Sequence, residues 1–167
     1  MKKSANIIIM SILTVCLLVV TAGNVFSKEH GTLKGMKSVK AVFDFERGNP
    51  QGALRGLQVI HQTFKDQNIW MGQKKPDIVV VFIGPAVKLT SKNKGGVTGD
   101  DQKILDEFAS TISEMSKDGI KFEICLIAVK AFGVEPSSIL PEIKQVGIGL
   151  ISLIGDQARG YSLVPIN

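Results

Sequence analysis

The chain has 167 residues, of which 44% are hydrophobic, and its 20 basic and 15 acidic residues give a net charge of +5. This length suits one domain with a core of its own, because single domains usually contain roughly 100–200 residues. The positive charge is small and scattered, which argues against nucleic-acid binding, so we expect no nucleic-acid partner.

The first 27 residues have the layout of a secretory signal peptide. Two lysines follow Met1, an almost wholly apolar run occupies residues 7–20, and Val25 and Ser27 stand at the minus-three and minus-one positions of a cleavage site. We therefore predict a signal peptide at 1–27, a flexible lead-in at 28–37 and an exported, periplasmic domain at 38–167.

Two alternatives to cleavage are weaker. The apolar run is shorter than the roughly 18–20 residues that a membrane-spanning helix needs, so we expect no permanent membrane anchor after cleavage, although a retained N-terminal anchor stays open. A lipid-modified Cys16 is disfavoured because Val15 stands where Gly, Ala or Ser usually precedes such a cysteine.

Cleavage changes the composition that matters for function. Removing Lys2 and Lys3 from the 20 basic residues leaves 18 against 15 acidic ones, a net charge of +3. Cys16 leaves with the signal peptide, so Cys125 becomes the one cysteine and cannot form an intrachain disulfide. A single thiol is unusual in an exported domain.

The first half of the domain alternates strand and helix patterns. Residues 39–45 alternate apolar and polar side chains, as in a half-buried strand. Asn49 and Pro50 form a helix start, and apolar residues then recur at helical spacing to about Asp66. Residues 77–83 are a continuous apolar, β-branched run, which favours the buried centre of a parallel sheet.

The second half continues this alternation. Thr98 and Asp101 resemble a capping box before a helix that closes near Gly119. Further strands are predicted at 121–125, 142–146 and 161–166, with helices at 126–132 and 147–159.

This alternation predicts an α/β fold. Strands joined by crossovers of a dozen or more residues form right-handed βαβ units, hence a three-layer α/β/α domain with a mainly parallel five-stranded sheet. Ligands of such sheets bind outside the carboxyl ends of the strands. That edge should carry residues 45–49, residues 84–99 and Cys125.

Cys125 stands where the third strand gives way to a helix, and two interpretations compete. Helix N-termini favour negative charge, which would activate a thiolate there. Free cysteines are nevertheless among the most buried residues, and the apolar neighbours Phe122, Ile124, Leu126 and Ile127 favour an inert, packed side chain.

Three segments resemble the DsrE/DsrF-like family, which includes the sulfur-relay Tus proteins. They are VVVFIGPAVKL at 79–89, FEICLIAVKAFGV at 122–134, and VGIGLISLIGDQARGYSLVPIN at 146–167 with its Gln-Ala-Arg-Gly-Tyr pattern. The resemblance covers most of the chain from Val39 onward.

The resemblance implies a parallel five-stranded domain that forms homo- or hetero-oligomers, often trimers or hexamers. It also implies a sulfur carrier or sulfurtransferase in which Cys125 is the catalytic residue. Cys125 would hold sulfane sulfur as a persulfide, received from a donor protein and passed to an acceptor thiol. The alternative is a non-catalytic oligomeric binding or accessory module in which Cys125 only packs.

Five residues after the second strand are candidates for substrate binding. Gly84 and Pro85 form the turn that follows the strand, and Lys88, Lys92 and Lys94 lie in a glycine-containing basic loop. The loop should share the sheet edge with Cys125, where it could attract anionic sulfur species or cover the thiol. The alternative is a solvated loop without such a role.

No other pattern predicts a metal, a cofactor or a second catalytic site. His61 has no second histidine or cysteine at metal spacing, which favours a core-edge histidine. Asp44 and Glu46 end the first strand without a clear acid/base pairing, and Gly147-Ile-Gly149 is too short for a dinucleotide fingerprint. The pair Trp70-Met71 suits either a subunit contact or packing on its own domain.

Overall fold

The computed structural model describes residues 31–71, 74–94 and 99–167. The predicted signal peptide at 1–27, part of the lead-in and the capping residue Thr98 lie outside these ranges. The strands are β1 (Lys40–Phe45), β2 (Asp77–Phe82), β3 (Lys121–Cys125), β4 (Ile143–Val146) and β5 (Ser162–Ile166). The helices are α2 (Pro50–Lys65), α3 (Asp100–Asp118), α4 (Leu126–Ala131) and α5 (Gly149–Ala158), with 3-10 turns η1 (Gly31–Leu33), η2 (Gln67–Ile69), η3 (Gly84–Thr90) and η4 (Pro136–Ser138).

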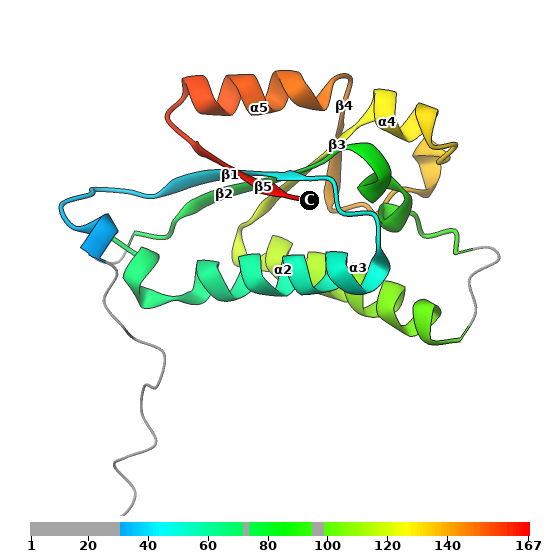
Figure 1. Cartoon of the computed structure of the whole chain (residues 1–167), viewed down its shortest axis with the longest axis horizontal. Helices are drawn as coiled ribbons and strands as arrows, with labels where there is room; N and C mark the ends of the chain where they lie inside the picture. The colour runs from blue at the N-terminus through cyan, green and yellow to red at the C-terminus, as the bar shows by residue number, and fades with distance from the viewer. Residues whose placement is uncertain (1–30, 72–73, 95–98) are drawn as a thin grey trace, which may run out of the picture. The chain divides into compact units, whose positions relative to one another are not determined.

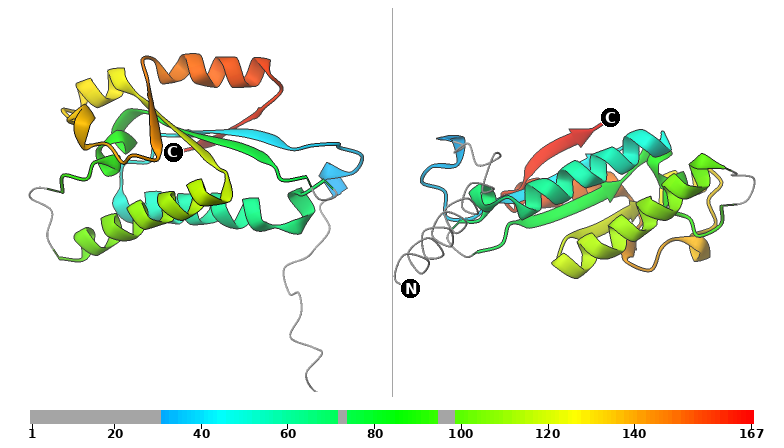
Figure 2. Two further views of the ribbon diagram at one scale, coloured as in Figure 1. Left: turned by 180° about the vertical axis from the view of Figure 1, so that it is seen from behind. Right: turned by 90° about the horizontal axis from the view of Figure 1, so that it is seen from below.

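The five strands form one parallel sheet in the order β4-β3-β2-β1-β5. Helices α2 and α3 cover one face of this sheet and α5 covers the other (Figures 1 and 2). The predicted three-layer α/β fold is therefore confirmed, and the sheet is parallel throughout. As predicted from its continuous apolar run, β2 is the central strand, with Ile78 to Phe82 all buried.

Local chemistry explains where the long helices begin and end. Asn49 caps α2, its side-chain oxygen accepting a hydrogen bond of 2.8 Å from the Gly52 N–H, and Pro50 occupies the first helical position. The N-cap of α3 is Gly99, one residue later than the predicted capping box. Gly119 ends α3 with φ +107°, a left-handed conformation that favours glycine.

The larger hydrophobic core lies between the sheet and the α2–α3 layer. Phe82 is at its centre: its ring centroid lies 5.2 Å from that of Phe45, 6.0 Å from that of Phe122 and 6.1 Å from that of Phe108. These four side chains are buried. A core of this kind fixes β1, β2 and β3 side by side, so their carboxyl ends meet at one edge.

A smaller core lies on the other face of the sheet, beneath α5. It consists of Val42, Val79 and Val81 from the strands and Leu153 from α5. Among the described residues, α5 supplies the helical side of this smaller core through Leu153. Within the described ranges, no helix is both long enough and apolar enough to cross a membrane.

Candidate functional site

Cys125 is the last residue of β3 and the N-cap of α4. Its backbone is still extended, with φ −76° and ψ 111°, and it pairs with Val146 of β4. Because side chains alternate along a strand, Cys125 lies on the opposite face from Ile124 and therefore on the α5 side of the sheet. The predicted strand-to-helix junction is confirmed.

The first residue of α5 covers Cys125. A Cβ atom added at Gly149 would lie 2.9 Å from the Cys125 Cβ and 3.1 Å from the side chain of Ile83. Glycine is required there because such a short distance is not tolerated between real side chains. The Cys125 side chain is consequently only 5% exposed. We call Gly149, which lies against Cys125, and the preceding Ile148 the cover segment.

The cover segment was not predicted from the sequence, in which Gly147-Ile-Gly149 was considered only as too short a match for a dinucleotide fingerprint. The Ile127 N–H donates a hydrogen bond of 3.4 Å to the Gly147 oxygen, which joins the start of α4 to the cover segment. The thiol of Cys125 makes no capping hydrogen bond to α4. The Gly-Ile-Gly sequence before an apolar helix was the available signal, but nothing in it specifies which side chain the helix meets.

Gly84 and Pro85 pack against the loop after β1. Gly84 has φ +57°, and a Cβ added there would lie 3.9 Å from the side chain of Glu46. A Cβ added at Gly48 would lie 2.6 Å from the Pro85 Cβ, so the two loops touch closely. The strand registers pair Phe45 with Phe82 and Phe82 with Ile124, so Glu46, Ile83 and Cys125 each follow directly at the ends of these paired positions.

The three candidate lysines, Lys88 in η3 and Lys92 and Lys94 after it, lie in different surroundings. The Lys88 ammonium is 5.7 Å from the ring centroid of Phe132, at the far end of α4. The Lys92 N–H donates to the Ser138 oxygen at 2.7 Å. The Lys94 ammonium forms an ion pair with Asp106 of α3. None of these contacts is to Cys125, and a substrate-binding role for the lysines stays a prediction.

Asp44 is a partly buried carboxyl group on the α5 side of β1. One of its oxygens, Oδ1, is buried and has no hydrogen-bond partner among the described residues. Burial and the negative charge of Glu46 raise the pKa of Asp44. Asp44 pairs in register with Val81 of β2, so an apolar strand separates it from β3 and Cys125.

His61 is a buried histidine at the edge of the core, as predicted. Its Nε2 lies 2.6 Å from Asp118 Oδ2, and Lys65 lies 3.6 Å from the same oxygen. The hydrogen bond from His61 lowers the pKa of Asp118. The described residues contain no group of three or more His, Cys, Asp or Glu side chains that could hold a metal ion.

Trp70 packs on its own domain. Its ring centroid lies 6.2 Å from that of Phe64, and its indole N–H donates to the Phe64 oxygen at 2.6 Å. Of the two interpretations of Trp70-Met71, the structure thus favours internal packing for Trp70.

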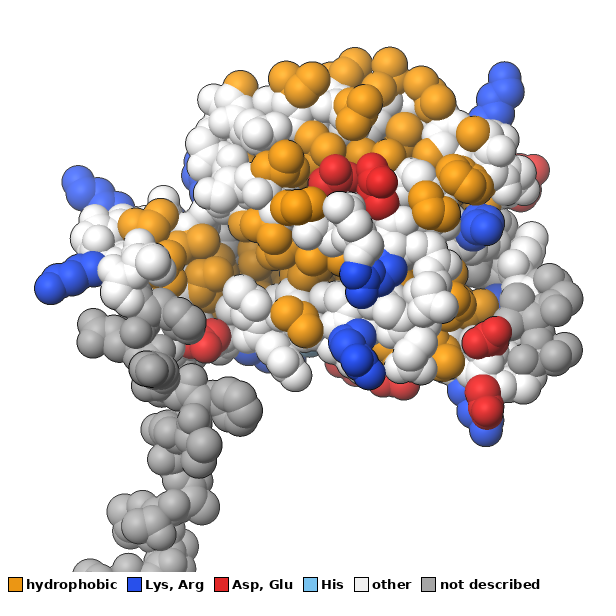
Figure 3. Space-filling view, in the orientation of Figure 1, with side chains coloured by type: hydrophobic (Ala, Val, Ile, Leu, Met, Phe, Trp, Pro, Cys, Tyr) orange, Lys and Arg blue, Asp and Glu red, His pale blue; other side chains and the backbone are white. Residues whose placement is uncertain are grey.

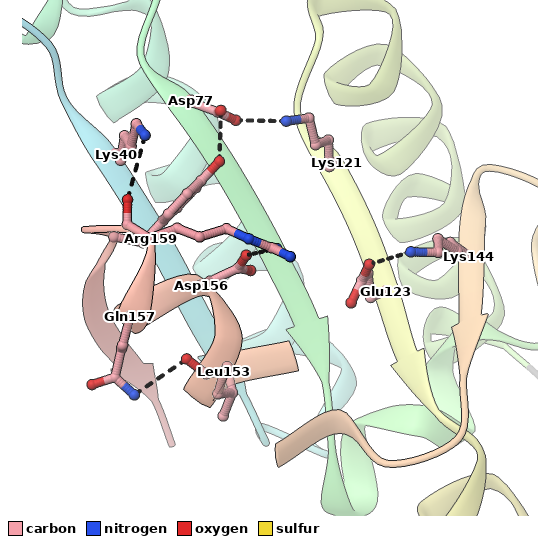
Figure 4. Close-up of polar contacts among 10 residues, drawn as sticks. Lys40, Asp77, Lys121, Glu123, Lys144, Leu153, Asp156, Gln157 and Arg159 are labelled. Carbon is pink, nitrogen blue, oxygen red and sulfur yellow. Dashed lines mark hydrogen bonds and ion pairs between the residues drawn. The ribbon is translucent and has the colours of Figure 1, made fainter. Parts of the chain in front are cut away.

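The Gln-Ala-Arg-Gly-Tyr segment lies at the opposite, amino-terminal edge of the sheet. The Tyr161 hydroxyl donates to Asp77 at 2.6 Å, and Lys121 donates to the other oxygen of Asp77 at 2.8 Å (Figure 4). Burial and this hydrogen bond raise the pKa of Tyr161 to about 12. Burial acts to raise the pKa of Asp77, but the hydrogen bonds from Lys121 and Tyr161, together with the positive charges of Lys121 and Lys40, lower that pKa overall.

A polar brace therefore links the starts of β2, β3 and β5, far from Cys125. It consists of Asp77, Lys121 and Tyr161. Lys40 extends the brace to β1, with its ammonium 5.4 Å from the Tyr161 ring centroid and 3.4 Å from the Arg159 oxygen (Figure 4). This segment supports the sheet and contributes nothing to the candidate site.

Comparisons with known proteins agree with this fold. Residues 40–166 match the model of the DsrE/DsrF-like family. A protein of unknown function from Methanobacterium thermoautotrophicum, MTH1491, superimposes with a TM-score of 0.60 at 16% identity, over 77% of this chain and 99% of that one. BT1422 from Bacteroides thetaiotaomicron, also of unknown function, superimposes with a TM-score of 0.55 at 23% identity. The match covers 76% of this chain and 94% of that one. No curated protein matches the chain.

Proposed function

Because the chain belongs to the DsrE/DsrF-like family, we propose that it handles sulfur by carrying a persulfide on Cys125 and passing it to a thiol of a partner protein. The observation that carries this proposal is the position of Cys125. It is a free cysteine at the carboxyl end of an inner strand of a parallel sheet, where such folds bind their ligands.

The start of a second helix lies beside Cys125. Gly149, the first residue of α5, lies against Cys125, and the free N–H groups of a first helical turn favour negative charge. A thiolate is the form that attacks sulfur.

The transfer consists of two thiol exchanges. The Cys125 thiolate attacks the outer sulfur of a donor persulfide R–S–SH, forms a new S–S bond and releases the donor as R–S⁻. An acceptor thiolate then attacks the outer sulfur of Cys125–S–SH, which yields R′–S–SH and restores the Cys125 thiolate. One sulfur atom moves, and no external oxidant or reductant is consumed.

Transfer requires the cover segment to move. At 5% exposure, the thiol cannot meet a protein-bound persulfide while Gly149 lies against it. A Cβ added at Gly147 would meet nothing within 4 Å, so this side of the residue before the cover segment faces open space. We infer that a partner protein opens the site at Ile148.

Export to the periplasm is part of the proposal. It rests on the leader at 1–27 and requires a partner that keeps Cys125 reduced, because the periplasm is oxidising. The other candidate function is a non-catalytic binding or accessory module. The burial of Cys125 beneath the start of α5 favours this second candidate.

Mass spectrometry separates the two candidates. The chain from Lys28 onward, which contains the compact unit Leu33–Asn167, is incubated with polysulfide or thiosulfate, and its intact mass is then measured. If the chain is a sulfur carrier, the wild type should gain the mass of one sulfur atom and lose it on reduction with dithiothreitol. The Cys125→Ser variant should gain no mass. Equal spectra for the two proteins would refute the carrier proposal for these donors.

Thiol accessibility provides the second arm of this test. Cys125 in the folded chain should react with iodoacetamide more slowly than in guanidinium chloride but at a measurable rate, because the cover segment opens. A thiol that reacts only at the rate of global unfolding would support the packing candidate.

A further inference from the structure

Helix α2 contacts the sheet closely near its start and leaves a groove near its end. A Cβ added at Gly56 would lie 3.2 Å from the side chain of Ile166, so the first half of the helix touches β5. Near the end of the helix, Thr63 is exposed and lines the groove. Another wall is the start of β5, which includes Ser162 and Val164. The groove therefore lies toward the amino-terminal edge of the sheet, away from the candidate site.

The groove is concave and largely apolar. Its volume is about 500 Å³, within the range of roughly 300–1,000 Å³ that small-molecule sites have. Phe43 is buried at its floor and pairs in register with Val164. In Figure 3 hydrophobic side chains line a recess on the left of the molecule, beside the first described residues. The apolar residues that line the groove include Leu33, Met36, Ala41, Phe43, Ile69 and Val164.

The segment before β1 supplies one wall of the groove. Leu33 and Met36 line this wall, and Met36 is 45% exposed although it is a large apolar side chain. Ser38 adds a hydroxyl group, which can donate a hydrogen bond. A concave apolar surface with a few polar groups is the usual form of a site for a small ligand.

The charges around this wall are positive. Residues 31–43 contain three lysines and no acidic residue. Two of them, Lys34 and Lys37, are exposed and precede and follow Met36 in the sequence. Lys40 and Arg159 also line the groove, but their charged ends contact other groups of the chain. Lys34 and Lys37 are thus the cations that an anionic ligand would meet.

These features select one class of ligand. An apolar tail suits the floor of the groove, and a single anionic head suits the two lysines. A peptide suits it poorly, because its backbone polar groups would lose water without finding partners. Regular pairing with β5 would not supply those partners, because Pro165 has no N–H to donate. The surface of a membrane is too flat to fill a concave site.

We propose that this groove binds one long-chain carboxylate, with its tail over Phe43 and Val164 and its carboxylate beside Lys34 and Lys37. The inference goes beyond the proposed function, because the groove lies away from Cys125 and its occupation requires no persulfide. The two sites can therefore be tested separately, and loss of the thiol should leave carboxylate binding unchanged.

Titration calorimetry tests the proposal with octanoate, decanoate and dodecanoate, each below the concentration at which it forms micelles. The chain from Lys28 onward should bind one molecule of each. Every added methylene should strengthen binding about fourfold, because it buries more apolar surface. Cys125→Ser should bind like the wild type. Affinities that do not depend on the length of the tail would overturn the proposal.

Filling the groove should block the tail. Thr63→Trp places a large ring at a residue that lines the groove, and displacing two methylenes should weaken decanoate binding about fifteenfold. The matched control is Gln62→Trp, because Gln62 is the neighbouring residue of α2, is also exposed and lines a different groove beside α3. Circular dichroism checks that both variants fold. Equal binding by the two variants would contradict the proposed position of the tail.

Removing the two lysines tests the position of the carboxylate. Lys34→Gln/Lys37→Gln should weaken decanoate binding roughly two- to thirtyfold, the range expected for two exposed ion pairs, and should make the affinity less sensitive to salt. The control is Lys103→Gln/Lys117→Gln on α3, which removes the same net charge from exposed residues away from the groove. An equal loss of affinity in both double variants would refute a specific role of Lys34 and Lys37.

Hydrogen exchange of the unmodified chain locates the ligand without a variant. Decanoate should slow exchange in peptides covering residues 31–43 and 160–166 and leave residues 121–131, around Cys125, unchanged. Protection confined to α5, whose Ile151 and Ile154 are exposed, would reveal adsorption to another apolar surface and would overturn the proposal. Binding to vesicles of anionic phospholipid without binding of monomeric decanoate would overturn it too.

Discussion

Replacing Gly149 by alanine tests the contact that closes the site. The new Cβ would lie 2.9 Å from the Cys125 Cβ and 3.1 Å from two carbons of Ile83. The Cys125 Cβ is attached directly to the backbone of β3 and cannot rotate away, so the start of α5 must move instead.

The expected loss of stability follows from two opposing effects. Overpacking of a well-packed site costs about 1–3 kcal/mol. Replacing glycine by alanine in a helix recovers about 0.5–1 kcal/mol, because alanine loses less backbone entropy on folding. We therefore expect Gly149→Ala to lower the free energy of unfolding by up to about 2.5 kcal/mol.

Urea unfolding followed by circular dichroism measures this change, and Gly155→Ala is the control. A Cβ at Gly155, in the same helix, meets nothing within 4 Å, so this variant should be more stable than the wild type by about 0.5–1 kcal/mol. Because Gly149→Ala moves the cover segment away from Cys125, it should also speed the alkylation of the thiol in the native protein, whereas Gly155→Ala should not.

The reasoning would be refuted if Gly149→Ala were as stable as Gly155→Ala. In that case Gly149 would not lie against Cys125, and the thiol would not be covered by α5. Unchanged alkylation in a destabilised Gly149→Ala protein would show that the strain is relieved elsewhere in the core.

Two further predictions concern ionisable groups. Because the pKa of Asp44 is raised in the folded state, the stability of the wild type increases as the pH falls through that pKa. Asp44→Asn should therefore be more stable than the wild type at mildly alkaline pH. Thermal unfolding scans should show this difference vanish below the ordinary pKa of 3.8. A stability difference that does not depend on pH would contradict this. The absorbance of ionised Tyr161 should appear near pH 12 and shift to lower pH in Asp77→Asn; an unshifted titration would argue against their hydrogen bond.

Much of the fold could be predicted from the sequence because its signals are local. The continuous apolar run of β2 predicted the central strand, and Asn49 with Pro50 predicted the start of α2. Both depend on neighbouring residues only. The junction at Cys125 was predicted for the same reason, since a strand pattern ends where a helix pattern begins.

The contacts that decide the chemistry of the site could not be predicted in this way. The cover over Cys125 depends on where α5 crosses the end of β3, which is set by packing of Leu153 on the sheet and leaves no sequence pattern. The pairing of Tyr161 with Asp77 joins residues 84 positions apart. The lysines illustrate the same limit, because their spacing in one loop did not reveal that Lys94 pairs with Asp106 on α3.

The pairing of β1 with β5 has a consequence for how the chain folds. β1 is the first strand of the sheet to be synthesised and β5 the last, yet they are neighbours. β1 therefore keeps one edge unpaired until Ile166 has left the ribosome, and closing so long a loop is slow. The export that we propose requires a chain that is unfolded while it crosses the membrane, and this order of strands delays completion of the sheet until β5 has been made. Chains that end before Ser162 should accordingly lack a cooperative unfolding transition.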